Sequence, residues 1–213
     1  MQLNRYIDHT FLKPEGTLKD IEKLIDEAIR YEFYSVCIHP FWVKTAHERL
    51  NGTNTQVATV VGFPLGANTM GVKIDEAQSA VEDGADELDM VMNIGKFKMG
   101  DEQYVLEEIN AVKEKAGERI VKVIVETCLL ADDEKKRAAE LIKKSNADFI
   151  KTSTGFSSGG ADIGDIRLFK SIMGDKYIKA SGGIRTKERA LEMIEAGAMR
   201  IGASSSVSIM EDN

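Results

Sequence analysis

The chain has 213 residues, 43% of them hydrophobic, and a formal net charge of −7. This length suffices for one well-buried domain, and the acidic balance disfavours nucleic acid and anionic membranes as partners, because both bind basic surfaces. No apolar run approaches the ~20 residues that span a bilayer, and the first residues lack the apolar segment of a signal peptide. The two cysteines, Cys37 and Cys128, form neither a disulfide framework nor a metal-ligand spacing, so we expect a cytoplasmic protein without a metal.

Short apolar runs bounded by turn residues predict eight strands. In chain order they cover 6–11, 35–38, 56–61, 86–92, 120–126, the start of 147–155, the start of 176–183, and 200–203. Between them, apolar residues at helical spacing and capping residues predict helices. The first two of these helices begin at Thr17 and near Pro40, and the third passes through Ile74 and ends at Gly84. The next three cover 102–115, 132–145 and 165–173, and the last runs from Thr186 to Gly197. A Ser-rich segment to Asn213 ends the chain.

Strand and helix thus alternate eight times, without a composition break that would mark a linker. Such alternation is typical of a parallel sheet with right-handed crossovers. Eight units in one domain, residues 1–213, predict an α/β fold, a single (β/α)8 TIM barrel. A doubly wound open sheet is the alternative, but the Gly-x-Gly-x-x-Gly turn typical of that fold is missing after the first strand.

Two lysines stand where apolar strands run into glycine turns. Lys151 ends the strand that starts at Ala147, and Lys179 lies near the end of the next strand. Either lysine alone is most simply a side chain that extends to the rim and keeps its ammonium in water. The pair favours a functional interpretation, because a cationic neighbour lowers the basicity of an amine and so makes a Schiff-base nucleophile at neutral pH.

Three further charged residues lie within apolar strands, namely Asp8, Asp89 and Lys122. In a barrel the active site lies at the carboxyl ends of the strands, and we expect these residues to meet Lys151 and Lys179 there. A single buried ion pair would be an ordinary structural feature. Two acids and three lysines converging from different strands indicate catalysis instead, because desolvating charges costs about as much as pairing them returns.

Small residues end the last three strands: Gly155, Gly182, Gly183, Gly202, Ser204 and Ser205. Glycine lets backbone amides approach an anion, and the helix N-termini that follow favour negative charge. Any one of these glycines alone is explained by a tight turn. The pair Gly182-Gly183, followed by Arg185 and adjoining the serines in barrel order, predicts a phosphate site at the last strands.

The combination and order of eight stretches is more specific than any of them alone. They are Asp8-His-Thr-x-Leu12, Val36-Cys-Ile38, Gly62-Phe-Pro-Leu-Gly66, Glu87-Leu-Asp-Met-Val-Met-Asn-Ile-Gly95, Lys122-Val-Ile-Val-Glu126, Phe149-Ile-Lys-Thr-Ser-Thr-Gly-Phe156, Lys179-Ala-Ser-Gly-Gly-Ile-Arg185 and Gly202-Ala-Ser-Ser205. Along nearly its whole length the sequence resembles the deoxyribose-phosphate aldolase family, which consists of class I aldolases.

The resemblance implies a cofactor-free enzyme in which Lys151 forms the Schiff base, Lys179 tunes it, and Asp89 takes part in proton transfer. The supporting residues that it implies are Asp8, Thr10, Cys37 and Lys122. The implied phosphate-binding residues are Gly155, Gly182, Gly183, Ile184, Arg185, Gly202, Ser204 and Ser205. From its strand position alone, Cys37 is predicted to pack in the core, with a place in the pocket wall as the alternative. The implied partners are a small sugar phosphate, aldehydes, and further copies of the chain in a homodimer or higher homo-oligomer.

Two features depart from the pattern of other family members. Phe156 stands where some members carry a lysine, and the chain ends at Asn213 without a tail whose tyrosine reaches the site. The resemblance implies reversible cleavage of 2-deoxy-D-ribose 5-phosphate to D-glyceraldehyde 3-phosphate and acetaldehyde, in deoxyribonucleoside breakdown. The alternatives are another phosphate-binding barrel aldolase or isomerase, and a non-catalytic sugar-phosphate binder.

Overall fold

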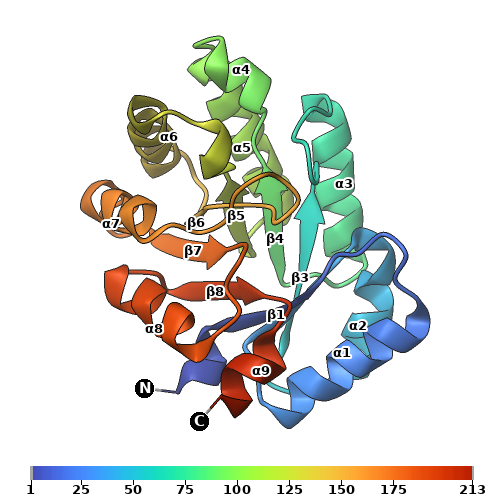
Figure 1. Ribbon diagram of the computed structural model, residues 1–213. Coiled ribbons are helices and arrows are strands. Elements are labelled where there is room, and N and C mark those ends of the chain that lie inside the picture. The colour runs from blue at the N-terminus through green and yellow to red at the C-terminus, as the bar shows by residue number, and fades with distance from the viewer. Residues whose placement is uncertain (1, 213) are drawn as a thin grey trace.

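The computed structural model describes residues 2–212, and within them eight parallel strands form one closed barrel. Each strand pairs with its neighbours in sequence, and β1 closes the barrel against β8 (Figure 1). The strands are β1 (Ile7–Phe11), β2 (Ser35–Ile38), β3 (Gln56–Val61), β4 (Glu87–Val91), β5 (Ile120–Ile124), β6 (Phe149–Lys151), β7 (Tyr177–Ser181) and β8 (Arg200–Ala203). The predicted (β/α)8 barrel is confirmed, and the open sheet is excluded.

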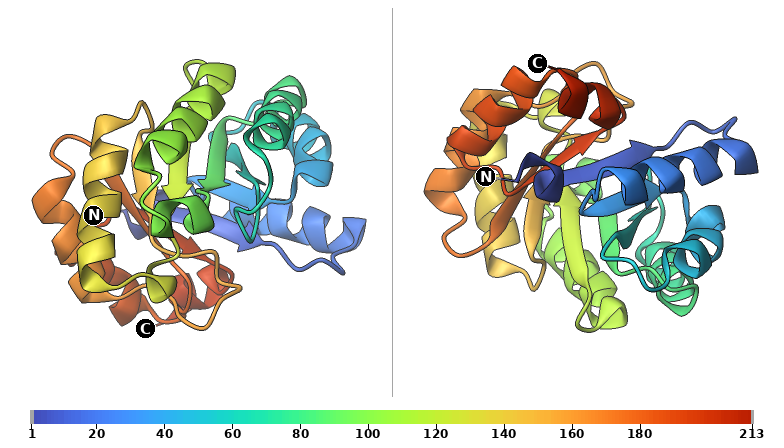
Figure 2. Two further views of the ribbon diagram at one scale, coloured as in Figure 1. Left: turned by 90° about the horizontal axis from the view of Figure 1, so that it is seen from above. Right: turned by 90° about the horizontal axis from the view of Figure 1, so that it is seen from below.

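Helices surround the barrel, and at least one follows each strand (Figure 1 and Figure 2). They are α1 (Leu18–Arg30), α2 (Val43–Leu50), α3 (Met70–Glu82), α4 (Ile94–Lys98), α5 (Glu102–Ala116), α6 (Asp132–Lys144), α7 (Ile163–Ile172), α8 (Lys187–Ala196) and α9 (Ser206–Glu211), with short 3-10 helices η1 (Leu3–Tyr6), η2 (Pro40–Trp42) and η3 (Thr127–Leu129). Within residues 2–212, none of them combines the length and the apolar character that crossing a membrane requires.

Successive residues of a strand point to opposite faces of the sheet, so each strand contacts two different buried environments. On β4, Leu88 and Met90 belong to the large apolar core that the strands share with the surrounding helices. The alternate residues Glu87 and Asp89 contact lysines of other strands inside the barrel. A small apolar cluster fills the barrel interior near β2 and β3, and it consists of Leu12, Cys37, Ala58 and Val60. The interior therefore has an apolar side at β2 and β3 and a charged side along β4 to β8 and β1.

The structure departs from the sequence prediction in three places. The Ser-rich segment at the end of the chain, for which no helix was predicted, contains helix α9, although Asn213 itself lies outside the described residues. Helix α4 was not predicted, because its five residues are too few to show a helical apolar period. The fifth strand ends at Ile124, and Glu126 has a left-handed backbone with φ of 55° instead of continuing the strand.

Candidate active site

The carboxylate of Asp89 is the meeting point of three lysines from the next three strands. Lys151 Nζ lies 2.8 Å and Lys179 Nζ 2.7 Å from Asp89 Oδ2, while Lys122 Nζ lies 2.7 Å from Oδ1. Strand register explains this meeting, because Asp89 pairs with Lys122 across β4 and β5, and Lys151 pairs with Lys179 across β6 and β7. All four side chains are buried.

Asp8 on β1 completes the set of charged residues that the sequence predicted to converge. Its carboxylate contacts Lys179 through Oδ2 and accepts a hydrogen bond of 2.7 Å from Ser35 Oγ at Oδ1. Lys122 Nζ lies 4.0 Å from the same Oδ2. The structure therefore brings both acids and all three lysines into one buried cluster.

Burial and charge together set the proton affinities in this cluster. Burial lowers the pKa of Lys151; Asp89 opposes that shift, and the positive charge of Lys179 adds to it. Burial also disfavours the charge of Lys179, but Asp8 and Asp89 outweigh it and raise the pKa of Lys179. Lys179 thus acts on Lys151 in the predicted direction, although burial is the larger cause. Of the two amines on Asp89 Oδ2, Lys151 releases its proton more readily.

Asp89 itself stays ionised. Burial raises the proton affinity of its carboxyl, but Lys122, Lys151 and Lys179 outweigh burial and hold the pKa of Asp89 well below its usual range. Asp8 behaves similarly: burial is outweighed by Arg200, Lys179 and Lys122, and the pKa of Asp8 is lowered. Both acids are therefore carboxylates at neutral pH.

Two charged residues of this buried cluster were not predicted from the sequence, namely Glu87 and Arg200. The guanidinium of Arg200 donates to both oxygens of Glu87, at 3.0 and 3.1 Å, and to Asp8 Oδ1 at 2.6 Å. Lys122 Nζ lies 2.5 Å from Glu87 Oε2. The signal was present in the sequence, since the two-residue alternation puts Glu87 on the same face of its strand as Asp89.

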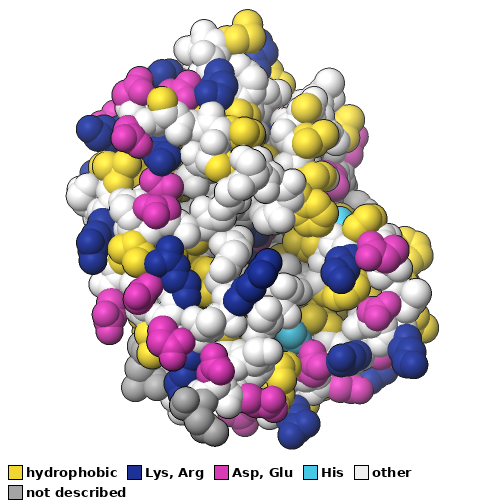
Figure 3. All heavy atoms as spheres, in the orientation of Figure 1, with side chains coloured by type: hydrophobic (Ala, Val, Ile, Leu, Met, Phe, Trp, Pro, Cys, Tyr) yellow, Lys and Arg dark blue, Asp and Glu magenta, His cyan; other side chains and the backbone are white. Residues whose placement is uncertain are grey.

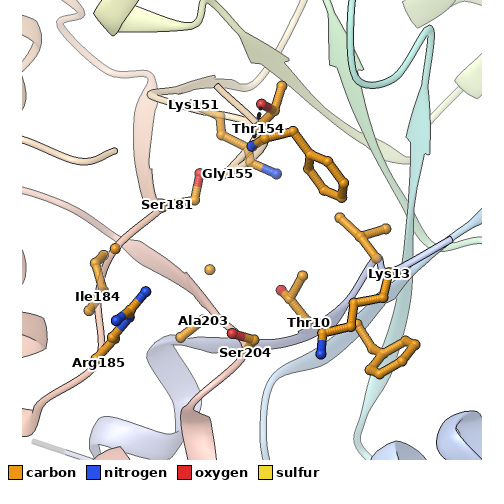
Figure 4. Close-up of a pocket in the computed structure, with 16 residues that line it drawn as sticks. Thr10, Lys13, Lys151, Thr154, Gly155, Ser181, Ile184, Arg185, Ala203 and Ser204 are labelled. Carbon is orange, nitrogen blue, oxygen red and sulfur yellow. Dashed lines mark hydrogen bonds between the residues drawn. The ribbon is translucent and has the colours of Figure 1, made fainter. Parts of the chain in front are cut away.

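Above this cluster a cavity of about 290 Å³ opens between the carboxyl ends of β6, β7, β8 and β1 (Figure 4). It reaches down to Lys151, whereas Asp89, Lys179 and Lys122 do not line it. Its wall comes from the last residues of these four strands and from the segments that follow them: Thr10, Phe11, Leu12, Lys13, Lys151, Thr154, Gly155, Phe156, Ser181, Gly182, Gly183, Ile184, Arg185, Gly202, Ala203 and Ser204. Within residues 2–212 this wall holds three basic side chains, Lys13, Lys151 and Arg185, and no carboxylate.

Seven of the eight predicted phosphate-binding residues lie in this wall, as does Thr10. Gly182 and Gly183 have φ of 89° and 77°, a left-handed backbone that other residues adopt only with strain. Gly202 also makes room for Lys179, because a Cβ on Gly202 would stand 3.0 Å from Lys179 Cε. The exception is Ser205, which lies one residue beyond the wall and precedes α9.

Cys37 lies beneath the cavity rather than in its wall. Its side chain is fully buried in the small apolar cluster, and Sγ lies 4.0 Å from Asp89 Oδ2. Burial raises the pKa of the Cys37 thiol, so the thiol stays neutral and adds no charge to the cluster. This placement matches the core-packing interpretation of Cys37.

One residue of the cavity rim was also missed. Lys13, in the loop after β1, lies across the cavity from Arg185 (Figure 4). Its signal is weak, because an exposed lysine before a proline is usually only a solvated side chain. Phe156 stands where some members of the resembled family carry a lysine. It packs edge-on against Phe63, with ring centroids 5.3 Å apart. Hydrophobic side chains gather beside the central hollow of the face in Figure 3.

Glu126 supports the loop after β6 from below. Its buried carboxylate accepts hydrogen bonds from the amide of Thr154, at 3.3 Å, and from the Thr154 hydroxyl. Thr154 Oγ1 in turn accepts a hydrogen bond of 3.0 Å from the amide of Phe156. The strained left-handed backbone of Glu126 thus serves to aim its side chain at the turn that contains Gly155.

Within residues 2–212 no group of three or more His, Cys, Asp or Glu side chains is placed to hold a metal ion. The chemistry available to the site is that of a buried amine under a cationic cavity. An amine with lowered proton affinity adds to carbonyl carbons, and the iminium that follows accepts electrons from a neighbouring carbon–carbon bond.

The family model and the curated relatives that match this sequence are aldolases. Residues 3–209 match the family described as DeoC/LacD family aldolase. A deoxyribose-phosphate aldolase of Clostridium botulinum (strain Loch Maree / Type A3) is 54% identical over 212 residues, which cover 99% of this chain and 100% of the relative. One from Streptococcus gordonii is 55% identical over 212 residues, which cover 99% of this chain and 96% of the relative.

Solved structures agree with the sequence relatives. An aldolase named QR15 superposes with a TM-score of 0.94 at 44% identity, covering 98% of this chain and 94% of its own. A tetrameric deoxyribose phosphate aldolase from Aeropyrum pernix has a TM-score of 0.90 at 32% identity, covering 98% of this chain and 89% of its own. With a barrel of this kind, and a family match over almost its full length, this chain belongs to the DeoC/LacD family of aldolases.

Proposed function

We propose that this chain is a class I aldolase that cleaves 2-deoxy-D-ribose 5-phosphate reversibly to D-glyceraldehyde 3-phosphate and acetaldehyde, in deoxyribonucleoside breakdown. The observation that carries the proposal is the position of Lys151. Among the three lysines that contact Asp89, it is the one that lines the cavity, and its pKa is lowered by burial. The names of the curated relatives at 54% and 55% identity support the same substrate.

The reaction begins at the amine of Lys151. As a neutral amine it adds to the aldehyde carbon, C1, of the open-chain sugar, and loss of water gives an iminium. The C3 hydroxyl then loses its proton, the bond between C2 and C3 breaks, and its electron pair moves to the nitrogen to leave an enamine. Glyceraldehyde 3-phosphate departs. The enamine carbon takes up a proton, and water hydrolyses the resulting iminium to acetaldehyde and free Lys151.

Asp89 and Lys179 serve these proton movements. Asp89 is the carboxylate in contact with Lys151, at 2.8 Å, and Lys179 donates to the same oxygen. We assign to this pair, acting through water, the transfer of protons between the C3 hydroxyl and the enamine carbon. Asp8 and Lys122 hold the pair in place, because each contacts one of its members.

The phosphate group lies at the rim formed by the loops after β6, β7 and β8. Gly155, Gly182 and Gly183 line this rim, and an anion can approach their backbone without a side chain in the way. Arg185 and Lys13 supply positive charge from two sides of the cavity (Figure 4). Lys13 thereby takes over the charge that a lysine would bring at the position of Phe156.

The chain acts in the cytoplasm as a homo-oligomer. Support for an oligomer comes from the solved relative of Aeropyrum pernix, which is tetrameric at 32% identity. Support for the compartment comes from the substrate, a product of intracellular nucleoside breakdown.

Product analysis tests this function. Purified protein incubated with 2-deoxy-D-ribose 5-phosphate should release acetaldehyde and glyceraldehyde 3-phosphate in equal amounts, and Lys151→Ala should release neither. An aldolase or isomerase of another sugar would leave this substrate intact and act on a different one. A non-catalytic binder would retain the sugar phosphate in equilibrium dialysis without producing either aldehyde. Either result would contradict the proposal.

A further inference from the structure

Six buried side chains inside the barrel form a closed ring of alternating charge. Each acid contacts the cation on either side, in the order Glu87, Arg200, Asp8, Lys179, Asp89, Lys122 and back to Glu87. We call these six residues the charge ring. None of them is more than 4% exposed. Lys151 is not a member; it touches the ring from outside, at Asp89.

The charge ring is electrically neutral by itself, since its three carboxylates face three cations. A proton on Lys151 therefore gives the cluster one positive charge in excess. In a buried site that excess is not screened by water, so it favours the free amine. The same reasoning applies later in the reaction. The cationic iminium again gives the cluster one positive charge in excess, and conversion of the iminium to a neutral enamine removes that charge.

We propose that Arg200 and Glu87 are positioning residues for this reaction, which close the charge ring at the amino ends of the strands and so hold Lys151 as a free nucleophile. The inference rests on the proposed function, in which the neutral amine of Lys151 attacks the sugar. Neither residue lines the cavity. They are the first residues of β4 and β8, at the end of the barrel opposite the cavity.

The geometry of Arg200 fits this task. Its planar fork donates to both oxygens of Glu87, a bidentate arrangement that fixes the direction of both side chains. One nitrogen of the fork also donates to Asp8, which contacts Lys179. The ring of Tyr34 covers the guanidinium, with its centroid 3.5 Å from Cζ. Arg200 is thus held too firmly to serve as a mobile surface charge.

The charged or titratable groups that act directly on Lys151 come from three strands: Cys37 on β2, Asp89 on β4 and Lys179 on β7. Asp8 on β1 and Lys122 on β5 contact Lys179 and Asp89 rather than Lys151 itself. Strand β3 contributes only Ala58 and Val60 to the interior cluster. Since Cys37 stays a neutral thiol, the net charge around Lys151 is set by the charge ring alone.

The pH dependence of kcat/KM for 2-deoxy-D-ribose 5-phosphate tests the inference. Activity needs the free amine, so it rises with pH through the pKa of Lys151. Arg200→Gln leaves the ring with a negative excess, which retains the proton on Lys151 and moves this ascending limb to higher pH. Glu87→Gln leaves a positive excess and moves the limb to lower pH. Arg200 lies two strands from Lys151, about 10 Å away, and an effective dielectric of about 20 then gives shifts of about one pH unit.

Two further variants separate charge balance from structure. The double variant Glu87→Gln with Arg200→Gln restores neutrality, and its limb should return to within a few tenths of a pH unit of wild type. Arg200→Lys keeps the charge but loses the fork, so it should lower kcat while leaving the limb in place. If Arg200→Gln does not fold, Glu87→Gln decides, because glutamine keeps the size of the side chain.

The inference is wrong if the ascending limb of the pH profile stays at its wild-type position in both single variants. It is also wrong if the limb of the double variant is shifted as far as that of Arg200→Gln. A failure of the proposed function gives a different result. In that case the wild-type protein itself would show no cleavage and no reducible adduct with acetaldehyde. Wild-type cleavage with unmoved limbs would leave the function standing and remove Arg200 and Glu87 from it.

Discussion

At the scale of the single residue, Lys151 differs from the other lysines of the cluster in how it is paired. Lys122 contacts Glu87 and Asp89, and Lys179 contacts Asp8 and Asp89. Lys151 contacts Asp89 alone, through an oxygen that Lys179 also occupies. A buried cation that shares its carboxylate partner with a second cation is incompletely neutralised, and this destabilises the folded state. The residue that performs the chemistry is therefore expected to lower stability.

Lys151→Met should make the protein more stable at neutral pH. Burial holds the pKa of Lys151 below the value of 10.5 for an ordinary lysine, so the unfolded chain binds this proton more tightly than the folded chain. The free energy of unfolding of the wild type therefore rises as the pH increases from the pKa of Lys151 in the folded chain toward its pKa in the unfolded chain. The variant has no lysine at this position, so its free energy of unfolding lacks this increase. We expect a Tm increase of about 2–4 °C, corresponding to about 1 kcal/mol, near pH 6–7.

The increase should shrink toward pH 10. Thermal melts followed by circular dichroism over this range provide the measurement, and Lys136→Met, which removes an exposed lysine from α6, serves as the control. A Tm below wild type at pH 6, or a difference that grows with pH, would contradict the account of Lys151 as a poorly paired cation.

Lys13→Met should weaken activity on the phosphorylated sugar only. Lys13 lies in the cavity wall at the rim, away from Asp89, so its charge is available to the phosphate rather than to the bond that breaks. We expect kcat/KM for 2-deoxy-D-ribose 5-phosphate to fall about tenfold, which is the scale of one exposed charge-assisted contact. The rate on 2-deoxyribose without phosphate should stay within twofold of wild type.

Lys19→Met is the matched control for Lys13, because Lys19 is exposed nearby on α1 and does not line the cavity. Equal losses on both sugars would show that Lys13 shapes the site by another route and would remove it from phosphate binding.

At the scale of the element, the loop between β6 and α7 carries the turn that faces the phosphate, and Glu126 anchors it. Glu126→Ala removes the acceptor for the Thr154 amide and hydroxyl, so the turn at Gly155 loses its support. Alanine shares the strain of a left-handed backbone, so the change tests the side chain alone. We expect KM for the phosphorylated sugar to rise about tenfold, with kcat within threefold of wild type.

Initial-rate kinetics measure both constants, with Glu118→Ala on the exposed surface as a control for the lost charge. If kcat collapses while KM is unchanged, Glu126 acts on the reacting atoms and its assignment as a loop anchor is wrong.

Most of the fold could be predicted from sequence because each strand is an apolar run that ends at turn residues. The strand containing Ser35 to Ile38 was predicted with the bounds it has in the structure. Helix α9 could not be recognised, because its serines favour turns and caps in isolation and only packing of Ile209 into the core makes them helical. The bend at Glu126 was likewise hidden, because its side-chain partner Thr154 lies 28 residues away.

The cluster on Asp89 could be predicted because a charged residue inside an apolar strand is costly to bury and needs partners of opposite charge. Glu87 and Arg200 were missed because each begins its strand, where a charged residue is usually exposed. The alternation with Asp89 indicates the face on which Glu87 lies, but the burial of both residues also depends on how the strands are staggered around the barrel. Ser205 was assigned to the phosphate site because small residues end the last strands and because of the family resemblance; in the structure it precedes α9, one residue beyond the cavity wall.

At the scale of the whole molecule, an acidic protein carries a cationic cavity. The net charge is −7, while Lys13, Lys151 and Arg185 line the cavity wall without a carboxylate among its described residues. The net negative charge of the molecule repels a phosphate, so attraction comes from the basic side chains of the cavity wall. Figure 3 shows acidic and basic side chains interspersed around the rest of that face.

This arrangement predicts a salt dependence that only the phosphorylated substrate shows. Screening shortens the reach of the cavity charges from about 10 Å at 0.1 M salt to about 3 Å at 1 M. We expect kcat/KM for 2-deoxy-D-ribose 5-phosphate to fall severalfold across that range of potassium chloride. The value for 2-deoxyribose should change by less than twofold. A parallel fall for both sugars would point to an effect of salt on the fold or on the reaction itself.

Borohydride reduction in the presence of acetaldehyde, followed by peptide mass mapping, identifies the lysine that forms the iminium. Lys151 should gain one ethyl group, while Lys122 and Lys179 of the same cluster remain unmodified, because only Lys151 combines a lowered pKa with a place in the cavity wall. The variant Lys151→Ala should gain none. Ethylation of Lys179 in place of Lys151, or an adduct that persists in Lys151→Ala, would contradict the account.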